Sequence, residues 1–348
     1  MSQTTYSKPE LFIDGNLIEY LESYSFSTSL NNTFQTLKVI SSDPDLHNIS
    51  LFGKKVELFQ NYGNYDGTPL FRGYITQFSN KETSFSISAQ DPRVFLAGKD
   101  GVTVTLTEKD NYDGFTLTQF LYSFITDEIN VESTVIGLSA LTEVDKPTFM
   151  TGIRAEAQAP WQLLTSTLQR SIDDDNPAEP LDYFTDIIHR KETSDLIFRK
   201  KRALTDRPSL RYSYNDGIVS ISFKERPPNS IGVAKTKDGK IQEFVYGNTP
   251  KGRVAVTLDE QYNTPAEAQT AARNKILLEY EDTKEMKIDV SKGHNLTLGS
   301  IIDIDVPDDE IRGVYRITGK NINYKGNSFT CSLSCNKKPI KVSDFFSS

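Results

Sequence analysis

Residues 70–92 read LFRGYITQFSNKETSFSISAQDP, and a similar stretch, IRGVYRITGKNINYKGNSFTCSLSCNKKP, occupies residues 311–339. Each stretch begins with a glycine-containing strand, passes through a short polar turn and ends in a strand of alternating character. The apolar face of that last strand is Phe85, Ile87 and Ala89 in the first copy, and we match it to Phe329, Cys331 and Leu333 in the second. This alternation with a period of two predicts antiparallel β-hairpins.

The similarity extends upstream of both hairpins. LFGKKVELF at 51–59 precedes the first and LTLGSIIDIDV at 296–306 precedes the second, so that Leu51 and Gly53 correspond to Leu298 and Gly299. Hairpins of similar pattern also arise by chance in any β-rich chain. Because the order of the elements agrees as well as the alternation, we predict a structural duplication.

The remaining sequence divides the chain into three predicted domains. Residues 1–100 form the first β-barrel-like domain, and residues 206–348 form the second, with a helical insertion near 240–285. The helix of this insertion begins at a capping box, Thr264-Pro265-Ala266-Glu267. Residues 101–205 contain two helical patterns and two strands. The predicted fold class is α+β, mainly β, with two similar antiparallel β-barrel-like domains and an inserted α+β domain.

Composition excludes several classes of protein. The 348 residues include 11% aromatic side chains, too many for a disordered chain, and the formal net charge of −8 argues against broad nucleic-acid binding. No apolar stretch approaches the roughly 18 residues that span a bilayer, and the first residues do not resemble a signal peptide. Cys331 and Cys335 lie four apart in a strand, about 13 Å, too far for a disulfide. We therefore expect synthesis in a reducing compartment and no membrane partner.

Motifs of catalysis are missing from the sequence. It contains no P-loop, no HExxH, no GxSxG and no CxxC, and its three histidines, His47, His189 and His294, lie far apart. We expect His189 to have a surface or structural role in its strand rather than a catalytic one. The sequence thus predicts that the protein is not an enzyme and has no catalytic, cofactor or metal site.

Two acidic clusters and one basic cluster leave alternatives open. Asp173, Asp174 and Asp175 with Asn176 could bind calcium but lack the spacing of an EF-hand, so a solvated loop is favoured. Asp303 and Asp305, followed by Asp308, Asp309 and Glu310, are favoured as charged residues on the outside of a strand and its turn over a metal site. A solvated face, a surface for a partner protein and contact with DNA are the alternatives for the basic run. Its members are Arg190, Lys191, Arg199, Lys200, Lys201, Arg202, Arg207 and Arg211.

The chain resembles the central baseplate hub proteins of phage tails, the late control protein D family, and the hub half of type VI secretion spike proteins. The resemblance rests on GKKVELF, PLFRGYITQF and SFSISAQDPRVFL, on Trp161 opening a helix, on DLIFRKKR and on the returning β-domain. It implies a homotrimer whose six similar domains form a pseudo-sixfold ring that adapts the hexameric tail tube to a trimeric spike and lets the genome pass.

The resemblance also implies where the protein works and with what. Its partners would be the tail tube protein, peripheral baseplate proteins and the tape measure protein, without stable nucleic-acid binding, in a virion baseplate assembled in the host cytoplasm. Because the chain ends at Ser348, soon after the second β-domain, the spike is expected to be a separate protein.

A carbohydrate-binding or carbohydrate-active β-sandwich protein is the alternative. The many Phe and Tyr residues with Trp161 could build a sugar platform, and two of the carboxylates could serve as an acid and base pair. Trp161 shares a predicted helix face with Leu164 and Leu168, which favours a core position instead.

Overall fold

The computed structural model describes most of the two β-rich regions and parts of the chain between them. The described residues are 8–30, 34–48, 50–60, 67–81, 84–97, 104–106, 119–120, 123–124, 155–159, 161, 163, 183–200, 208–225, 231–245, 255–281, 284–291, 295–306 and 311–336.

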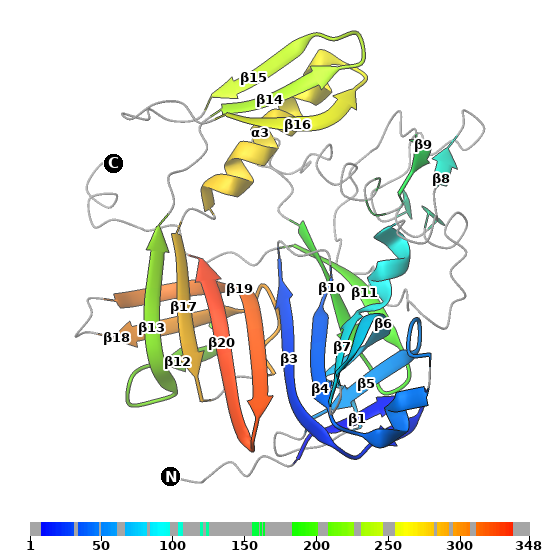
Figure 1. Ribbon diagram of the computed structural model, residues 1–348. Helices are drawn as coiled ribbons and strands as arrows, with labels where there is room; N and C mark the ends of the chain where they lie inside the picture. Colours follow the sequence, from blue (N-terminus) through cyan, green and yellow to red (C-terminus); the bar gives the residue numbers. More distant parts are fainter. Residues whose placement is uncertain are drawn as a thin grey trace.

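Strands dominate the described chain (Figure 1). In order they are β1 (Glu10–Ile13), β2 (Asn16–Ile18), β3 (Leu21–Ser29), β4 (Thr36–Ser41), β5 (Lys55–Phe59), β6 (Phe71–Lys81), β7 (Ser84–Gln90), β8 (Val104–Leu106), β9 (Ala155–Gln158), β10 (Tyr183–His189), β11 (Ser194–Lys200), β12 (Leu210–Tyr212), β13 (Ile218–Glu225), β14 (Ile231–Thr236), β15 (Ile241–Val245), β16 (Ala255–Tyr262), β17 (Lys284–Val290), β18 (Ile301–Val306), β19 (Ile311–Lys325) and β20 (Ser328–Asn336). The helix α3 (Pro265–Glu281) lies between β16 and β17.

The strands repeat one pairing order twice. In the first half the order is β3-β4-β7-β6-β5-β1, and in the second it is β13-β17-β20-β19-β18-β12. We call these the first and second β-units. Only the last pair differs, because β1 is antiparallel to β5 whereas β12 is parallel to β18. The strand order therefore supports the duplication predicted from the sequence.

Irregularities in the backbone recur at equivalent places in both β-units. The first strand of each unit has a bulge, at Glu22 in β3 and at Val219 in β13. The long strand of each has another, at Thr76 in β6 and Thr318 in β19. Gly53 and Gly299 share a positive φ of 76°, and their N–H groups donate to Ile75 O and Ile317 O. Since bulges fix the register of a sheet, these marks align the two β-units residue by residue.

This alignment corrects part of the match made from the sequence. Counted from the bulges, Phe85 corresponds to Cys331 and Ala89 to Cys335. The sequence match had paired them with Phe329 and Leu333, two residues earlier in β20. Gly53 and Gly299 correspond as predicted. The hairpin arm beyond the bulge runs from Gly319 to Lys325 in β19 but only from Gln77 to Lys81 in β6, so counting from the hairpin tip misplaced the pairs.

In the described ranges neither β-unit closes into a barrel, which corrects the barrel-like prediction. Instead β3 pairs with β19, and the two units join into one 13-stranded sheet with a shared hydrophobic cluster (Figure 1). Because the free edge of one unit is covered by the other, closure within a unit is unnecessary. The proposed domain limits of 100 and 205 remain predictions.

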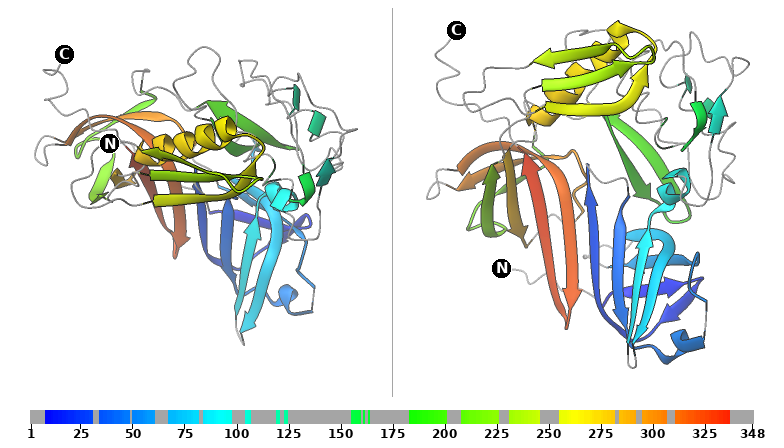
Figure 2. Two further views of the ribbon diagram at one scale, coloured as in Figure 1. Left: turned by 90° about the horizontal axis from the view of Figure 1, so that it is seen from above. Right: turned by 45° about the horizontal axis from the view of Figure 1, so that its top comes forward.

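The predicted insertion is a separate small unit with its own core. Strands β15-β14-β16 form a three-stranded sheet that packs against Ala268, Ala272 and Ile276 of α3. The Glu267 N–H donates to Thr264 Oγ1 at 3.2 Å, as the capping box predicts, whereas the Glu267 carboxylate accepts from the N–H of Asn263 at 3.1 Å. Figure 2 shows this unit beyond the ends of β13 and β17.

Little of the predicted central domain is described. It includes the hairpin of β10 and β11 and the pair of β8 and β9, while most of both predicted helices falls outside the described residues. Within the described chain no helix is long and apolar enough to cross a bilayer. Cys331 and Cys335 are buried free thiols on β20.

Candidate assembly surface

One face of the long sheet carries short polar side chains. The other face forms the hydrophobic cluster, because the side chains alternate along every strand. We call the polar side the serine face. Its described side chains are those of Ser23, Ser25, Ser27, Ser29, Thr36, Lys38, Ile40, Gln77, Ser79, Ser84, Ser86, Ser88, Gln90, Ser220, Ser222, Lys287, Asp289, Asn321, Asn323, Lys325, Ser328, Thr330, Ser332 and Ser334.

Charge on the serine face is sparse and partly satisfied within the sheet. Burial acts to raise the pKa of Asp289, but hydrogen bonds from Ser220 at 2.6 Å and Ser332 at 2.5 Å, with the charge of Lys287, hold it below its ordinary value. Proteins bind the phosphate backbone of DNA mainly through Lys and Arg side chains. A surface made chiefly of hydroxyl and amide groups therefore offers few strong contacts to DNA.

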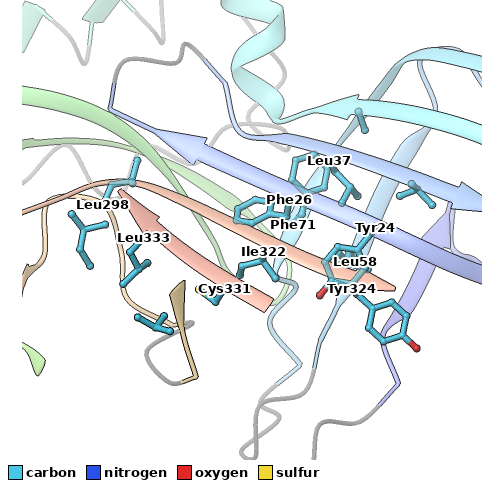
Figure 3. Packing of buried hydrophobic residues seen from close by; sticks show 14 of the residues in the cluster. Tyr24, Phe26, Leu37, Leu58, Phe71, Leu298, Ile322, Tyr324, Cys331 and Leu333 are labelled. Atoms are coloured by element: carbon cyan, nitrogen blue, oxygen red, sulfur yellow. The ribbon is translucent and has the colours of Figure 1, made fainter. Parts of the chain in front are cut away.

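The junction of the two β-units is a regular antiparallel ladder. Its Cα partners run from Gly319 opposite Ser29 to Lys325 opposite Ser23. On the core side Tyr24 stacks on Tyr324 with ring centroids 5.7 Å apart, and Phe26 lies opposite Ile322 (Figure 3). Stacked aromatic pairs across strands contribute to sheet stability beyond their buried area. The junction is thus built like the interior of the sheet.

A buried polar cluster ties the hairpin of β10 and β11 to the first β-unit. The guanidinium of Arg93 makes a forked ion pair with Asp91, Nε to Oδ1 at 3.0 Å and Nη2 to Oδ2 at 2.7 Å. Burial acts to lower the pKa of Arg93, yet the Asp91 and Asp186 charges raise it. Asp91 also accepts the backbone N–H of Gln35 at 2.5 Å. The side chain of Gln35 then bonds the hairpin, donating to Asp186 and to the carbonyl of Ile187.

His189 lies inside this cluster, as the structural expectation for it predicts. Its Nδ1 is 2.9 Å from Ser194 Oγ and its Nε2 is 3.0 Å from Gln35 Oε1. Burial, with the charges of Arg72 and Arg93, lowers its pKa to about 3. Both ring nitrogens are engaged and the ring is buried, so the contact with Ser194 lies in the packed interior.

Arg72 anchors the turn of the same hairpin. Its Nη1 donates to the carbonyls of Arg190 at 3.1 Å and Thr193 at 2.5 Å, its Nη2 donates to Lys191 O at 2.6 Å, and its Nε pairs with Glu57. One buried guanidinium thus satisfies three carbonyls of the turn while strand β6 holds its backbone.

The neutral His189 makes stability depend on pH. Because its pKa is about 3 in the folded chain and about 6.5 when unfolded, the unfolded chain binds more protons between these values. We expect the free energy of unfolding to fall by up to about 1.4 kcal/mol per pH unit below pH 6.5. The raised pKa of Asp186 acts in the opposite sense just above its ordinary value. Urea unfolding of the protein and of His189→Gln from pH 4.5 to 7.5 isolates the histidine, and parallel pH profiles would contradict its role.

Most of the other residues proposed from the sequence do not come together. His47 lies in a short 3-10 helix (Pro44–Asn48), and His294, Asp173–Asp175, Asn176, Asp308, Asp309 and Glu310 lie outside the described residues. Asp303 and Asp305 lie on β18 and pair with Arg211, at 3.4 and 2.7 Å. In the described ranges no three metal-binding side chains cluster.

The basic run is not one surface in the described chain. Arg211 is paired with β18, Arg190 pairs with Asp195 at 3.2 Å, and Lys191 contributes its carbonyl to Arg72. The side chains of Arg199 and Lys200, and the whole of Lys201, Arg202 and Arg207, fall outside the described part. Trp161 is half-buried with Arg93 above its ring at 5.8 Å, so the proposed sugar platform has a cation on that face of the indole.

Comparison with known proteins identifies the fold. No protein-family model matches the chain, and no curated protein matches it in sequence. A tail protein from Neisseria meningitidis MC58 superposes with a TM-score of 0.69 at 12% identity, over 96% of this chain and 97% of that one. The chain has the fold of phage tail proteins. The expected resemblance is therefore confirmed at the level of the fold.

Two further structures share the tail-protein fold. The 43 kDa tail protein of prophage MuSo2 from Shewanella oneidensis gives a TM-score of 0.64 at 10% identity, covering 95% of this chain and 98% of its own. A type VI secretion component of E. coli, described as similar to bacteriophage T4 tail proteins, gives 0.55 at 9% identity, covering 95% of this chain and 77% of its own. These three structures are described as tail proteins or as a secretion component, not as enzymes.

Sequence reasoning missed the match between the first strands of the two β-units. LESYSFS at 21–27 and IVSISFK at 218–224 align through their bulges at Glu22 and Val219. The signal is present in the sequence. In the first β-unit, however, the next strand follows within a few residues, whereas in the second the β14–α3 unit intervenes, which hides the correspondence.

Proposed function

We propose that this protein is the structural hub of a phage tail baseplate. Three chains close into a ring of six similar β-units, which joins a hexameric tail tube to a trimeric spike. The observation that carries the proposal is the duplication of strand order and bulges within one continuous sheet. Two equivalent units per chain are what a threefold assembly needs to present a sixfold surface.

The serine face supports a lining role in this ring. It is the side of the sheet opposite the hydrophobic cluster, and it presents mainly hydroxyl and amide groups, with Lys38, Lys287 and Lys325 as the cations among its described side chains. If that face lines the opening, a passing genome meets little to hold it, since phosphate contacts from Lys and Arg supply most non-specific affinity for DNA. Stable nucleic-acid binding is therefore not part of the proposed function.

The proposed partners follow from this geometry. The tail tube protein contacts one rim of the ring, a separate spike protein contacts the other, and peripheral baseplate proteins and the tape measure protein approach from outside or through the opening. We place the protein in the baseplate of the virion, assembled in the host cytoplasm.

Assembly state tests the proposal most directly. Light scattering coupled to size exclusion should give a mass three times that of the 39.2 kDa chain, and negative-stain images should show rings with six similar lobes. A fluorescent 30-base-pair duplex should show no salt-sensitive binding at physiological ionic strength. A chain that stays monomeric at tens of micromolar and gives no rings with purified tube protein would refute the hub role.

A further inference from the structure

Both β-units present an edge for pairing, but only one such pair is made between the described strands. β3 lies along the part of β19 beyond its bulge, residues Gly319 to Lys325. The equivalent part of β6 pairs with β7 on one side and, in the described chain, with no strand on the other. Among the strands that the structure describes, β13, the equivalent of β3, is the last at its end of the sheet.

We propose that β13 of one chain pairs antiparallel with β6 of the next chain, in the register that β3 adopts on β19. This inference rests on the proposed ring and specifies its interface between chains. The occupant of each edge is a second copy of the same chain, because the junction of β3 and β19 already shows the two complementary edges joined. A head-to-tail contact of this kind closes a ring when its rotation allows.

Exposure at the two edges matches this assignment. Gln77, Phe78, Ser79 and Asn80 of β6 are all exposed, and Phe78 keeps 45% of its surface in solvent. Their equivalents on β19, Gly319 to Ile322, lie beside β3 and are buried or half-buried. On β13, Ser222 is exposed, whereas its equivalent Ser25 on β3 is half-buried. An exposed apolar side chain such as Phe78 at a bare edge is unusual for a strand that must avoid aggregation, unless another strand covers it.

The bulges set the register of the proposed pair. Ser27 lies opposite Asn321 in the chain, and their equivalents are Lys224 on β13 and Ser79 on β6. In the same register Phe223 faces Asn80, Ser222 faces Lys81 and Glu225 faces Phe78. No like charges stand opposite each other in these pairs, which is the condition for a stable ladder.

Hydrogen-bond alternation identifies the best pair for a disulfide. The Leu30 N–H donates to Thr318 O at 2.8 Å, so Lys320 and Ile322 belong to hydrogen-bonded pairs and Asn321 does not. Non-hydrogen-bonded pairs bring the Cα atoms to about 4.5 Å, within the range for a disulfide. Ser79 and Lys224, the equivalents of Asn321 and Ser27, would therefore form a non-hydrogen-bonded pair at the proposed interface.

Cysteine cross-linking of the full chain tests the register. Mixing Ser79→Cys with Lys224→Cys under mild oxidation should give a covalent two-chain band on a non-reducing gel, while each variant alone gives none. The double variant should give a ladder that ends at three chains. As matched controls, Ser27→Cys with Asn321→Cys should link within one chain, and Ser79→Cys with Ser220→Cys, about 13 Å out of register, should not link.

Each outcome separates the pairing from the ring. Trimeric mass by light scattering without the Ser79–Lys224 link would overturn this pairing and leave the hub proposal standing. Links that continue beyond three chains would support the pairing and overturn ring closure. A covalent dimer from Ser79→Cys alone would show that β6 pairs with itself and would refute the inference.

Discussion

Replacing Arg93 by methionine is expected to lower the free energy of unfolding by about 3–5 kcal/mol. The guanidinium is 2% exposed, and its loss leaves the Asp91 carboxylate, which is fully buried, without its cation. Asp186 loses a nearby positive charge at the same time. Since the pair joins the first β-unit to the hairpin of β10 and β11 through Gln35, the hairpin should detach first. Urea titration by circular dichroism, with proteolysis at the hairpin, measures both effects.

Lys54→Met is the matched control for Arg93. Its ammonium pairs with Asp14 at 3.2 Å, but both side chains are partly in water, so we expect a loss below about 1 kcal/mol. Equal losses in the two variants would mean that the buried ion pair does not stabilise the fold.

Replacing Phe78 by proline is expected to abolish assembly while leaving a folded monomer. In the proposed register the Phe78 N–H points to the neighbouring chain, because its equivalent Lys320 belongs to a hydrogen-bonded pair with Thr28. Proline removes this N–H and is tolerated at a strand edge. Light scattering should show the mass fall from three chains to one, with the far-ultraviolet spectrum of the wild-type chain.

Two substitutions control for the loss of the Phe78 side chain and for general damage. Phe78→Val removes the ring but keeps the N–H, so assembly should persist with weaker affinity. In Ser79→Pro the lost N–H faces β7 inside the sheet, so the thermal midpoint of the monomer itself should fall. A Phe78→Pro protein that remains trimeric would exclude β6 from the interface.

Local features of the fold were accessible from the sequence. Alternation located β6, β7, β19 and β20, because it reflects side-chain periodicity, and the capping box located α3, because it reflects hydrogen bonds within a few residues. The pairing of β3 with β19 was not accessible. This pairing joins residues nearly 300 positions apart in the sequence. The sequence of neither strand specifies which of several free edges the strand will pair with.

The candidate site likewise combines local features that the sequence indicates with long-range contacts that it does not. The serines of β3 alternate with apolar residues in the sequence, but their continuation across β7, β20 and β13 follows from sheet order alone. Arg93 and Gln35 gave no signal, since a buried arginine is recognised only when its partners are placed around it. His189 was expected to be a surface or structural residue, and only the fold shows its buried contacts with Gln35 and Ser194.

The two β-units differ most in the connection between their first two strands. In the first unit β3 reaches β4 through a short loop that ends at Gln35, and in the second β13 reaches β17 through the unit of β14, β15, β16 and α3. These connections leave equivalent ends of equivalent strands, so in a ring they share one rim. Along that rim, three short loops would alternate with three protruding β14–α3 units. A partner with threefold symmetry could then bind the rim in only three equivalent orientations.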